Sequence, residues 1–232
     1  MEPSLGWNEP IDAYCERLGP EFWAEPVNAV SNLAFLIAAL VMAQRLKGHR
    51  LPLAWALVAV LTCIGLGSFA FHTFATPWAA TLDVVPIGVF ILVYLFAANR
   101  DFWGLPIGWS LFGVALFIPY AALLVPLFDR LGWLGSSAGY APVPVLIAIY
   151  GIALYSRARQ TGQGLLLGAL ILVVSLTFRT LDLPLCSAFP LGTHVAWHIL
   201  NGIMLGWMIE VYRRHMLELQ AEKNPEDKGS WA

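Results

Sequence analysis

Long apolar runs, separated by short segments of charged and turn residues, dominate this chain of 232 residues. Each run is long enough to cross the hydrocarbon core of a bilayer, which takes about 20 helical residues. The runs are continuous rather than alternating, so they predict helices and not the strands of a barrel. We expect an all-α polytopic membrane protein, a bundle of seven transmembrane helices over residues 27–46, 52–74, 78–98, 105–127, 140–155, 165–181 and 191–212.

The composition agrees with a membrane location. Apolar residues make up 59% of the chain and charged residues only 12%, whereas soluble domains carry about 25% charged residues. The net charge of −2 provides no basic surface for nucleic acid. An ordinary cytosolic enzyme, a disordered chain and a nucleic-acid binder are therefore excluded. The expected partner is a membrane lipid, and no protein partner is implied.

The basic residues are distributed unevenly between the two sides of the predicted bundle. Lys and Arg are retained on the cytoplasmic side of membrane proteins. Ten of the 13 lie in the connections after the first, third and fifth runs or in the C-terminal tail: Arg45, Lys47, Arg50, Arg100, Arg157, Arg159, Arg213, Arg214, Lys223 and Lys228. The N-terminus is therefore expected outside and the C-terminus in the cytoplasm, as in a protein of a bacterial inner membrane.

This orientation divides the chain into three parts. Residues 1–26 form a non-cytoplasmic segment, residues 27–212 the helical domain and residues 213–232 a cytoplasmic tail. The first segment has no basic residues just before the apolar run, as a secretory signal would have, so the first helix is expected to be retained.

Two cysteines fall on the non-cytoplasmic side, where a disulfide can persist. Cys15 precedes the first helix and Cys186 follows the sixth. They either form a bridge that ties the N-terminal segment to the loop before the last helix, or remain two unpaired thiols. Cys63 lies in the middle of a predicted helix, where a thiol packs like a small apolar group.

Five polar side chains lie within the predicted helices at one depth. Ser68 and His72 end the second run, Asp83 lies early in the third, and His194 and His198 begin the seventh. At 1.5 Å per residue, all five lie within about 10 Å of the outer boundary. Ionisable groups inside a membrane are costly, so they mark a functional site by default.

The spacing of the histidines favours a metal site over hydrogen-bonded packing residues. His194 and His198 are four residues apart, so both imidazoles face one side of a helix. With His72 they make three imidazoles, the usual protein ligands of catalytic zinc, which leave a fourth position for water. No Glu lies between the paired histidines, so Asp83, the carboxylate expected at this depth, would act on that water.

Oxygen-bearing side chains also cluster before the first helix. Asp12, Glu16 and Glu25, with Asn28, favour calcium, which takes six to eight oxygen ligands. The alternative is a solvated acidic cap, which is common in such stretches.

Three motifs together resemble the alkaline ceramidase family. They are Tyr14-Cys-Glu16 followed by Glu25-Pro-Val-Asn-Ala-Val-Ser-Asn32, then Gly67-Ser-Phe-Ala-Phe-His72 with Asp83, and finally His194-Val-Ala-Trp-His198. This family is a branch of the seven-helix zinc hydrolases that also include the adiponectin and progestin receptors.

The resemblance implies hydrolysis of the amide of ceramide to a fatty acid and a sphingoid-type amine. It assigns zinc to the three histidines, catalysis to Ser68 and Asp83, and calcium to Glu16, Glu25 and Asp12. Its paired cysteines correspond to Cys15 and Cys186. The chain departs from the family pattern at two places, because Asp12 lies three residues before the cysteine rather than two, and Leu18 stands where an oxygen ligand is expected.

A competing hypothesis is a seven-helix lipid receptor, or a structural metal protein, without hydrolysis. Such a protein needs neither an open metal position nor a base. The free carboxylate of Asp83 and the lack of a fourth strong ligand favour the enzyme.

Overall fold

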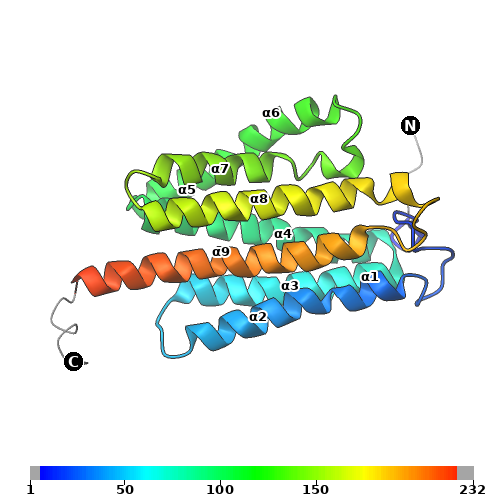
Figure 1. Cartoon of the computed structure of the whole chain (residues 1–232), viewed down its shortest axis with the longest axis horizontal. Helices are drawn as coiled ribbons and strands as arrows, with labels where there is room; N and C mark the ends of the chain where they lie inside the picture. The colour runs from blue at the N-terminus through cyan, green and yellow to red at the C-terminus, as the bar shows by residue number, and fades with distance from the viewer. Residues whose placement is uncertain (1–5, 224–232) are drawn as a thin grey trace.

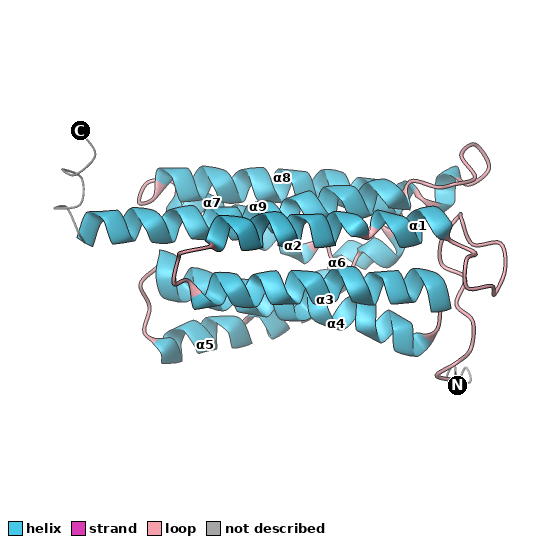
Figure 2. Ribbon diagram, turned by 90° about the horizontal axis from the view of Figure 1, so that it is seen from below, coloured by secondary structure: helices cyan, strands magenta, loops and turns pink. Residues whose placement is uncertain are grey.

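The computed structural model describes residues 6–223, and this part of the chain contains helices and no strands (Figure 2). The α-helices are α1 (Pro26–Ser31), α2 (Leu33–Leu46), α3 (Pro52–Phe74), α4 (Pro77–Ala97), α5 (Ile107–Ala115), α6 (Phe117–Asp129), α7 (Pro142–Leu154), α8 (Arg159–Leu181) and α9 (His194–Lys223). Three short elements join them: the π-helix η1 (Ala98–Phe102) and the 3₁₀-helices η2 (Gly135–Ser137) and η3 (Leu183–Leu185).

The helices run side by side along one axis and are joined by loops at its two ends (Figure 1). Six stretches are long and apolar enough to cross a membrane, which indicates an integral membrane protein: Pro26–Leu46, Pro52–Phe74, Pro77–Phe102, Ile107–Asp129, Gly135–Leu154 and Arg159–Leu181. These stretches correspond to the first six expected helices. The seventh, expected over residues 191–212, is helix α9, which continues into a charged end at Lys223 and is not among the six.

Proline explains several of the observed boundaries. Helices α3, α4 and α7 begin at Pro52, Pro77 and Pro142, because the first helical position needs no backbone N–H. The fourth predicted run divides into α5 and α6, since Pro119 cannot donate to the Ala115 carbonyl one turn earlier. Beyond this break α6 diverges from the bundle (Figure 1) and buries none of its side chains.

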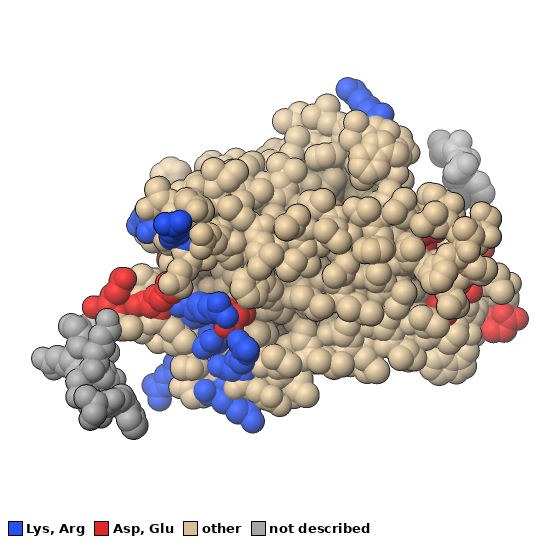
Figure 3. All heavy atoms as spheres, viewed as in Figure 1, with Lys and Arg blue, Asp and Glu red and all other residues tan. Residues whose placement is uncertain are grey.

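Charged side chains lie at the two ends of the bundle (Figure 3). Lys and Arg gather at the end where α9 finishes, and the visible face between the ends is almost entirely uncharged. This is the distribution expected of a protein that lies in a bilayer.

The apolar core lies between α2, α3, α4, α8 and α9. Its buried side chains include Phe35, Leu61, Phe90, Leu172 and Ile209. Small residues allow the helices to approach closely: a Cβ on Gly202 of α9 would lie 3.0 Å from the backbone of Ala34 in α2. Close packing at small residues is the usual means of helix association in membranes, and here it holds α9 against the first span.

Candidate active site

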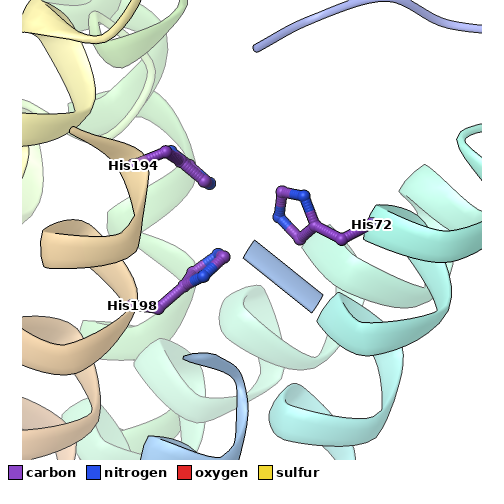
Figure 4. A group of neighbouring side chains, drawn as sticks. All are labelled: His72, His194 and His198. Carbon is purple, nitrogen blue, oxygen red and sulfur yellow. The ribbon is translucent and has the colours of Figure 1, made fainter. Parts of the chain in front are cut away.

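Three histidines converge at the end of the bundle where α9 begins. His72 lies in the last turn of α3, whereas His194 begins α9 and His198 follows one turn later, and the three rings point toward one another (Figure 4). One ring nitrogen from each lies within 4.8 Å of the others, and each residue is only 1% exposed. The predicted histidine set is therefore assembled in the fold.

Glu25 fixes the tautomer of His72. The Glu25 carboxylate lies 2.6 Å from Nδ1 of His72, and an ionised carboxylate can only accept a hydrogen bond. Nδ1 therefore carries the proton, and Nε2 keeps its lone pair. That Nε2 atom is buried and has no hydrogen-bond partner within the described residues 6–223.

Ser31 has the same effect on His198. Its hydroxyl lies 2.7 Å from the Asn28 carbonyl, to which it donates, and 2.6 Å from Nδ1 of His198. A hydroxyl has one proton to give. Nδ1 of His198 is therefore the donor to Ser31, which leaves Nε2 as the ligand atom.

The start of α9 is fixed by the buried carboxylate of Asp182. This carboxylate accepts hydrogen bonds from the backbone N–H groups of Thr193 (2.7 Å) and His194 (2.9 Å) at the helix start, and from that of Cys15 (3.0 Å). Cys15 and Cys186 form a disulfide, which confirms the bridged alternative. The N-terminal segment and the loop before α9 are thus joined beside the first histidine.

Tyr14 covers the histidines from outside. Its ring stacks on that of His194 with 3.7 Å between centroids, and lies 5.2 Å from the ring of His72. Burial raises the pKa of the Tyr14 hydroxyl, so this group stays protonated. The N-terminal segment therefore closes the outer side of the site with an aromatic ring rather than with solvent.

Ser68 and Asp83 lie at a close approach of α3 and α4. A Cβ on Gly67 would overlap the Leu82 carbonyl, so the helices reach this separation only because position 67 lacks a side chain. Here Ser68 lies close enough to the Asp83 carboxylate to interact with it, and His72 and Arg179 are near the same carboxylate. The predicted catalytic pair therefore lies beside the histidine set.

Arg179 supplies a positive charge near this pair. Its guanidinium lies 5.1 Å from the centre of the Tyr140 ring and 5.9 Å from that of Trp197, and it donates to the hydroxyl of Ser136 at 2.7 Å. Aromatic faces attract a guanidinium, so Arg179 is held in place in the last turn of α8.

The donor set suits a transition metal. Three imidazole nitrogens, two of them fixed by outer partners, match the three-ligand arrangement of catalytic zinc sites. The unpartnered Nε2 of His72 is the kind of buried polar atom that a bound metal satisfies. The three histidines therefore fit a metal ion.

A family model described as Ceramidase matches residues 13–232. The chain belongs to the ceramidase family. It is therefore an amide hydrolase that acts on ceramide-like substrates, and the resemblance seen in the three motifs is confirmed. No curated protein matches the chain in sequence.

The first of the acids expected to bind calcium does not lie with the others in this ceramidase. Asp12 is exposed, whereas Glu16 and Glu25 are buried. The two oxygens of Glu16 accept from the backbone N–H groups of Val27 (2.6 Å) and Asn28 (2.8 Å), at the start of α1. Glu16 therefore caps a helix.

Glu25 is also fully engaged. One of its oxygens contacts Nε of Arg17 at 2.5 Å, and the other lies 2.6 Å from Nδ1 of His72. Burial alone would raise the pKa of Glu25, but the hydrogen bonds from His72 and Arg17 and the positive charge of Arg17 outweigh it, so the pKa lies below its ordinary value. Glu25 is thus a second carboxylate at the depth where Asp83 alone was expected.

The three acids of the predicted calcium set do not gather as a group in the described structure. Among residues 6–223, only the three histidines form a group of three or more His, Cys, Asp or Glu residues close enough to hold a metal ion. The Glu16 carboxylate bonds to the start of α1, the Glu25 carboxylate bonds to Arg17 and His72, and Asp12 is exposed. Calcium needs oxygens that converge on one point.

Sequence reasoning missed several residues that shape the ceramidase site. Ser31 and Asp182 reach His198 and His194 across 167 and 12 residues, and no local spacing reveals such pairs. Arg17 could have been recognised from the sequence as a partner for these acids, because it is the only Lys or Arg in residues 1–26.

Proposed function

We propose that this protein is a zinc-dependent intramembrane amidohydrolase. It would cleave ceramide-like N-acyl lipids to a free fatty acid and a sphingoid-type amine. The observation that carries the proposal is the placement of three buried imidazoles, with ligand nitrogens left free, beside the Ser68–Asp83 pair in a chain of the ceramidase family.

Zinc is the metal that this ligand set favours. His72, His194 and His198 would hold it, and the outer partners Glu25 and Ser31 keep two of the imidazoles in the tautomer that binds a metal. When bound, zinc polarises the amide carbonyl and lowers the pKa of water at the site to about 7.

Asp83 is the proposed general base and acid. Its carboxylate would take a proton from the attacking water and give it to the nitrogen of the leaving amine, so that the amine departs neutral. The other carboxylates that contact the histidines in the described structure have partners already. Glu25 is held by Arg17 and His72, and Asp182 accepts from three backbone N–H groups.

Ser68 is the proposed oxyanion donor. Its side chain is buried and lies near the Asp83 carboxylate. Turned toward the substrate, the same hydroxyl would donate to the amide oxygen as negative charge develops there. Removal of one such donor typically costs about 10²–10³ in rate.

An apolar cavity provides a place for a lipid chain. It is lined by side chains of α4, α7, α8 and α9, and it includes Trp197 and Asn201, which flank His198 on α9. Most of its other lining residues are Leu, Ile, Phe and Met. A substrate entering sideways from the bilayer would place one hydrocarbon chain here and its amide beside the histidines.

The proposed membrane arrangement counts α9 as a seventh span. The N-terminal segment and the site would then lie near the non-cytoplasmic face, and the C-terminal tail in the cytoplasm of a bacterial inner membrane. The Lys and Arg gathered at the far end (Figure 3) and the disulfide beside the site support this orientation.

A hydrolysis assay on the purified protein tests the proposal. The protein in lipid nanodiscs would be given N-acyl sphingoid lipids, and the released fatty acid and amine would be quantified by mass spectrometry. We expect release to stop after zinc is removed by a chelator and to return when zinc is restored. Retention of lipid binding by the zinc-loaded protein without any release would favour the receptor alternative.

A further inference from the structure

Arg17 lies in the interior of the N-terminal segment rather than on its surface. Only 5% of the residue is exposed. Its guanidinium donates to the Glu25 carboxylate at 2.5 Å, to the Gly19 carbonyl at 2.9 Å and to the His72 carbonyl at 3.2 Å. A buried charge is tolerated only when it is paired and hydrogen-bonded, and here all three groups that it contacts are oxygen acceptors.

These acceptors come from two separate parts of the chain. Gly19 and Glu25 belong to the N-terminal segment, whereas His72 belongs to the last turn of α3. Carbonyls in the last turn of a helix lack intrahelical donors and favour a nearby positive charge. One guanidinium therefore binds the segment to the end of the helix that carries a histidine of the site.

We propose that Arg17 is a built-in cation that replaces calcium in this segment and positions His72 through Glu25. Arg17 neutralises Glu25, and Glu25 in turn accepts from Nδ1 of His72. Arg17 also holds the backbone of His72 directly. The planar guanidinium fixes the direction of both contacts, as a flexible ammonium would not. Arg17 is thus a positioning residue for a metal ligand.

The remaining oxygens of the segment cannot supply a calcium site beside Arg17. Glu16 is used by two backbone N–H groups, Asp12 is exposed, and Leu18 is apolar and 95% exposed. Within the described part of the chain, the buried acceptors at this start of α1 that remain without a partner are Asn28 Oδ1 and Asn32 Oδ1. Two amide oxygens fall far short of the six to eight ligands that calcium takes.

The first experiment measures calcium directly. The zinc-loaded protein is dialysed against radioactive calcium, and its thermal unfolding is recorded with and without calcium chloride. We expect no stoichiometric binding at millimolar calcium and no shift in Tm. One bound calcium per chain with a rise in Tm would overturn the proposal.

The second experiment asks whether Arg17 acts on His72. Zinc is replaced by cobalt, whose visible absorption reports the geometry of the three ligands, and Arg17→Ala is compared with Arg130→Ala, an exposed arginine after α6. We expect Arg17→Ala to alter the absorption and to weaken metal affinity about 10-fold to 100-fold, and guanidinium salt to restore part of both. An unchanged spectrum in folded Arg17→Ala would overturn the proposal.

A second variant covers the case in which Arg17→Ala does not fold. Arg17→Lys keeps the charge but loses the planar fork, so we expect a folded protein with an altered cobalt spectrum that calcium does not correct. A spectrum like that of the unaltered protein would count against positioning by the guanidinium.

The inference rests on the proposed role of His72 as a metal ligand, but its failure can be told apart from that of the proposed function. An altered cobalt spectrum in Arg17→Ala, with no lipid hydrolysis by the unaltered protein, would support the positioning role of Arg17 and reject the proposed hydrolase function. Lipid hydrolysis by the unaltered protein, with an unchanged cobalt spectrum in Arg17→Ala, would support the hydrolase function and reject the positioning role.

Discussion

Ser31 and His198 lie 2.6 Å apart, hydroxyl oxygen to ring nitrogen, although 167 residues separate them in the chain. The hydroxyl is itself anchored, because it donates to the Asn28 carbonyl within α1. The first span thus sets the orientation of an imidazole on the last helix. Outer partners of this kind tune metal sites nearly as strongly as the ligands do.

The variant Ser31→Ala tests this relationship. We expect metal affinity to fall about 10-fold to 100-fold, since the imidazole of His198 loses the acceptor that fixes its tautomer. Competition with a coloured chelator measures the affinity. Thr177→Ala is the control, because that exposed hydroxyl bonds only to its own helix, and equal affinities in the two variants would contradict the prediction.

The variants Asp83→Asn and His72→Ala should separate catalysis from metal binding. Asparagine has the size of aspartate but cannot take a proton, so we expect the rate of lipid amide hydrolysis to fall by about 10²–10⁴ with zinc retained. His72→Ala should lose both zinc and activity. Metal analysis and the hydrolysis assay are run on the same samples, and near-normal turnover of Asp83→Asn would place the base elsewhere.

The variant Asp182→Ala should destabilise the protein. Three backbone N–H groups, those of Cys15, Thr193 and His194, would lose their acceptor. A buried donor left unsatisfied costs about 1–3 kcal/mol, and of the three hydrogen bonds only that of His194 is fully buried, so we expect the free energy of unfolding to fall by about 1–3 kcal/mol. Unfolding in sodium dodecyl sulfate measures it. The exposed Asp129→Ala is the matched control, and an equal loss in both would show that the buried contacts contribute little.

The variant Gly67→Ala should disturb the Ser68–Asp83 pair. A methyl group at this position would overlap the Leu82 carbonyl, so α4 must shift, at a cost of about 1–3 kcal/mol. We expect lower activity and a lower Tm. Gly88→Ala is the control, because a Cβ at Gly88 meets nothing within 4 Å. Full activity in Gly67→Ala would mean that this close approach is not needed.

The spans and the histidine set could be predicted from the sequence because their signals are local or depend on depth alone. An apolar run of about 20 residues has few alternatives to a membrane helix. His194 and His198 share a helix face by spacing, and His72 meets them because it lies at the same depth. The predicted disulfide rested on a similar argument, since both cysteines lie on one side of the bundle.

The network around the histidines could not be predicted in the same way. The acids before α1 indicated calcium because composition does not reveal which partner each oxygen takes. Glu16 instead accepts from a helix N-terminus, and Glu25 pairs with Arg17 and His72. These contacts depend on how the N-terminal segment folds over the bundle end, which is a tertiary property. The split of the fourth run and the extension of α9 to Lys223 are likewise set by backbone geometry and by packing rather than by hydropathy.

The position of the metal ligands along the chain bears on the order of assembly during synthesis. A growing chain that has reached the end of α8 at Leu181 contains only His72 of the three histidines. The disulfide partner of Cys15, Cys186, has not yet been synthesised. Two imidazoles, including the His194 ring on which Tyr14 stacks, arrive with the final helix, and the disulfide partner Cys186 comes just before it. Because the proposed hydrolysis needs all three histidines, a chain that still lacks α9 would be inert toward the lipids around it.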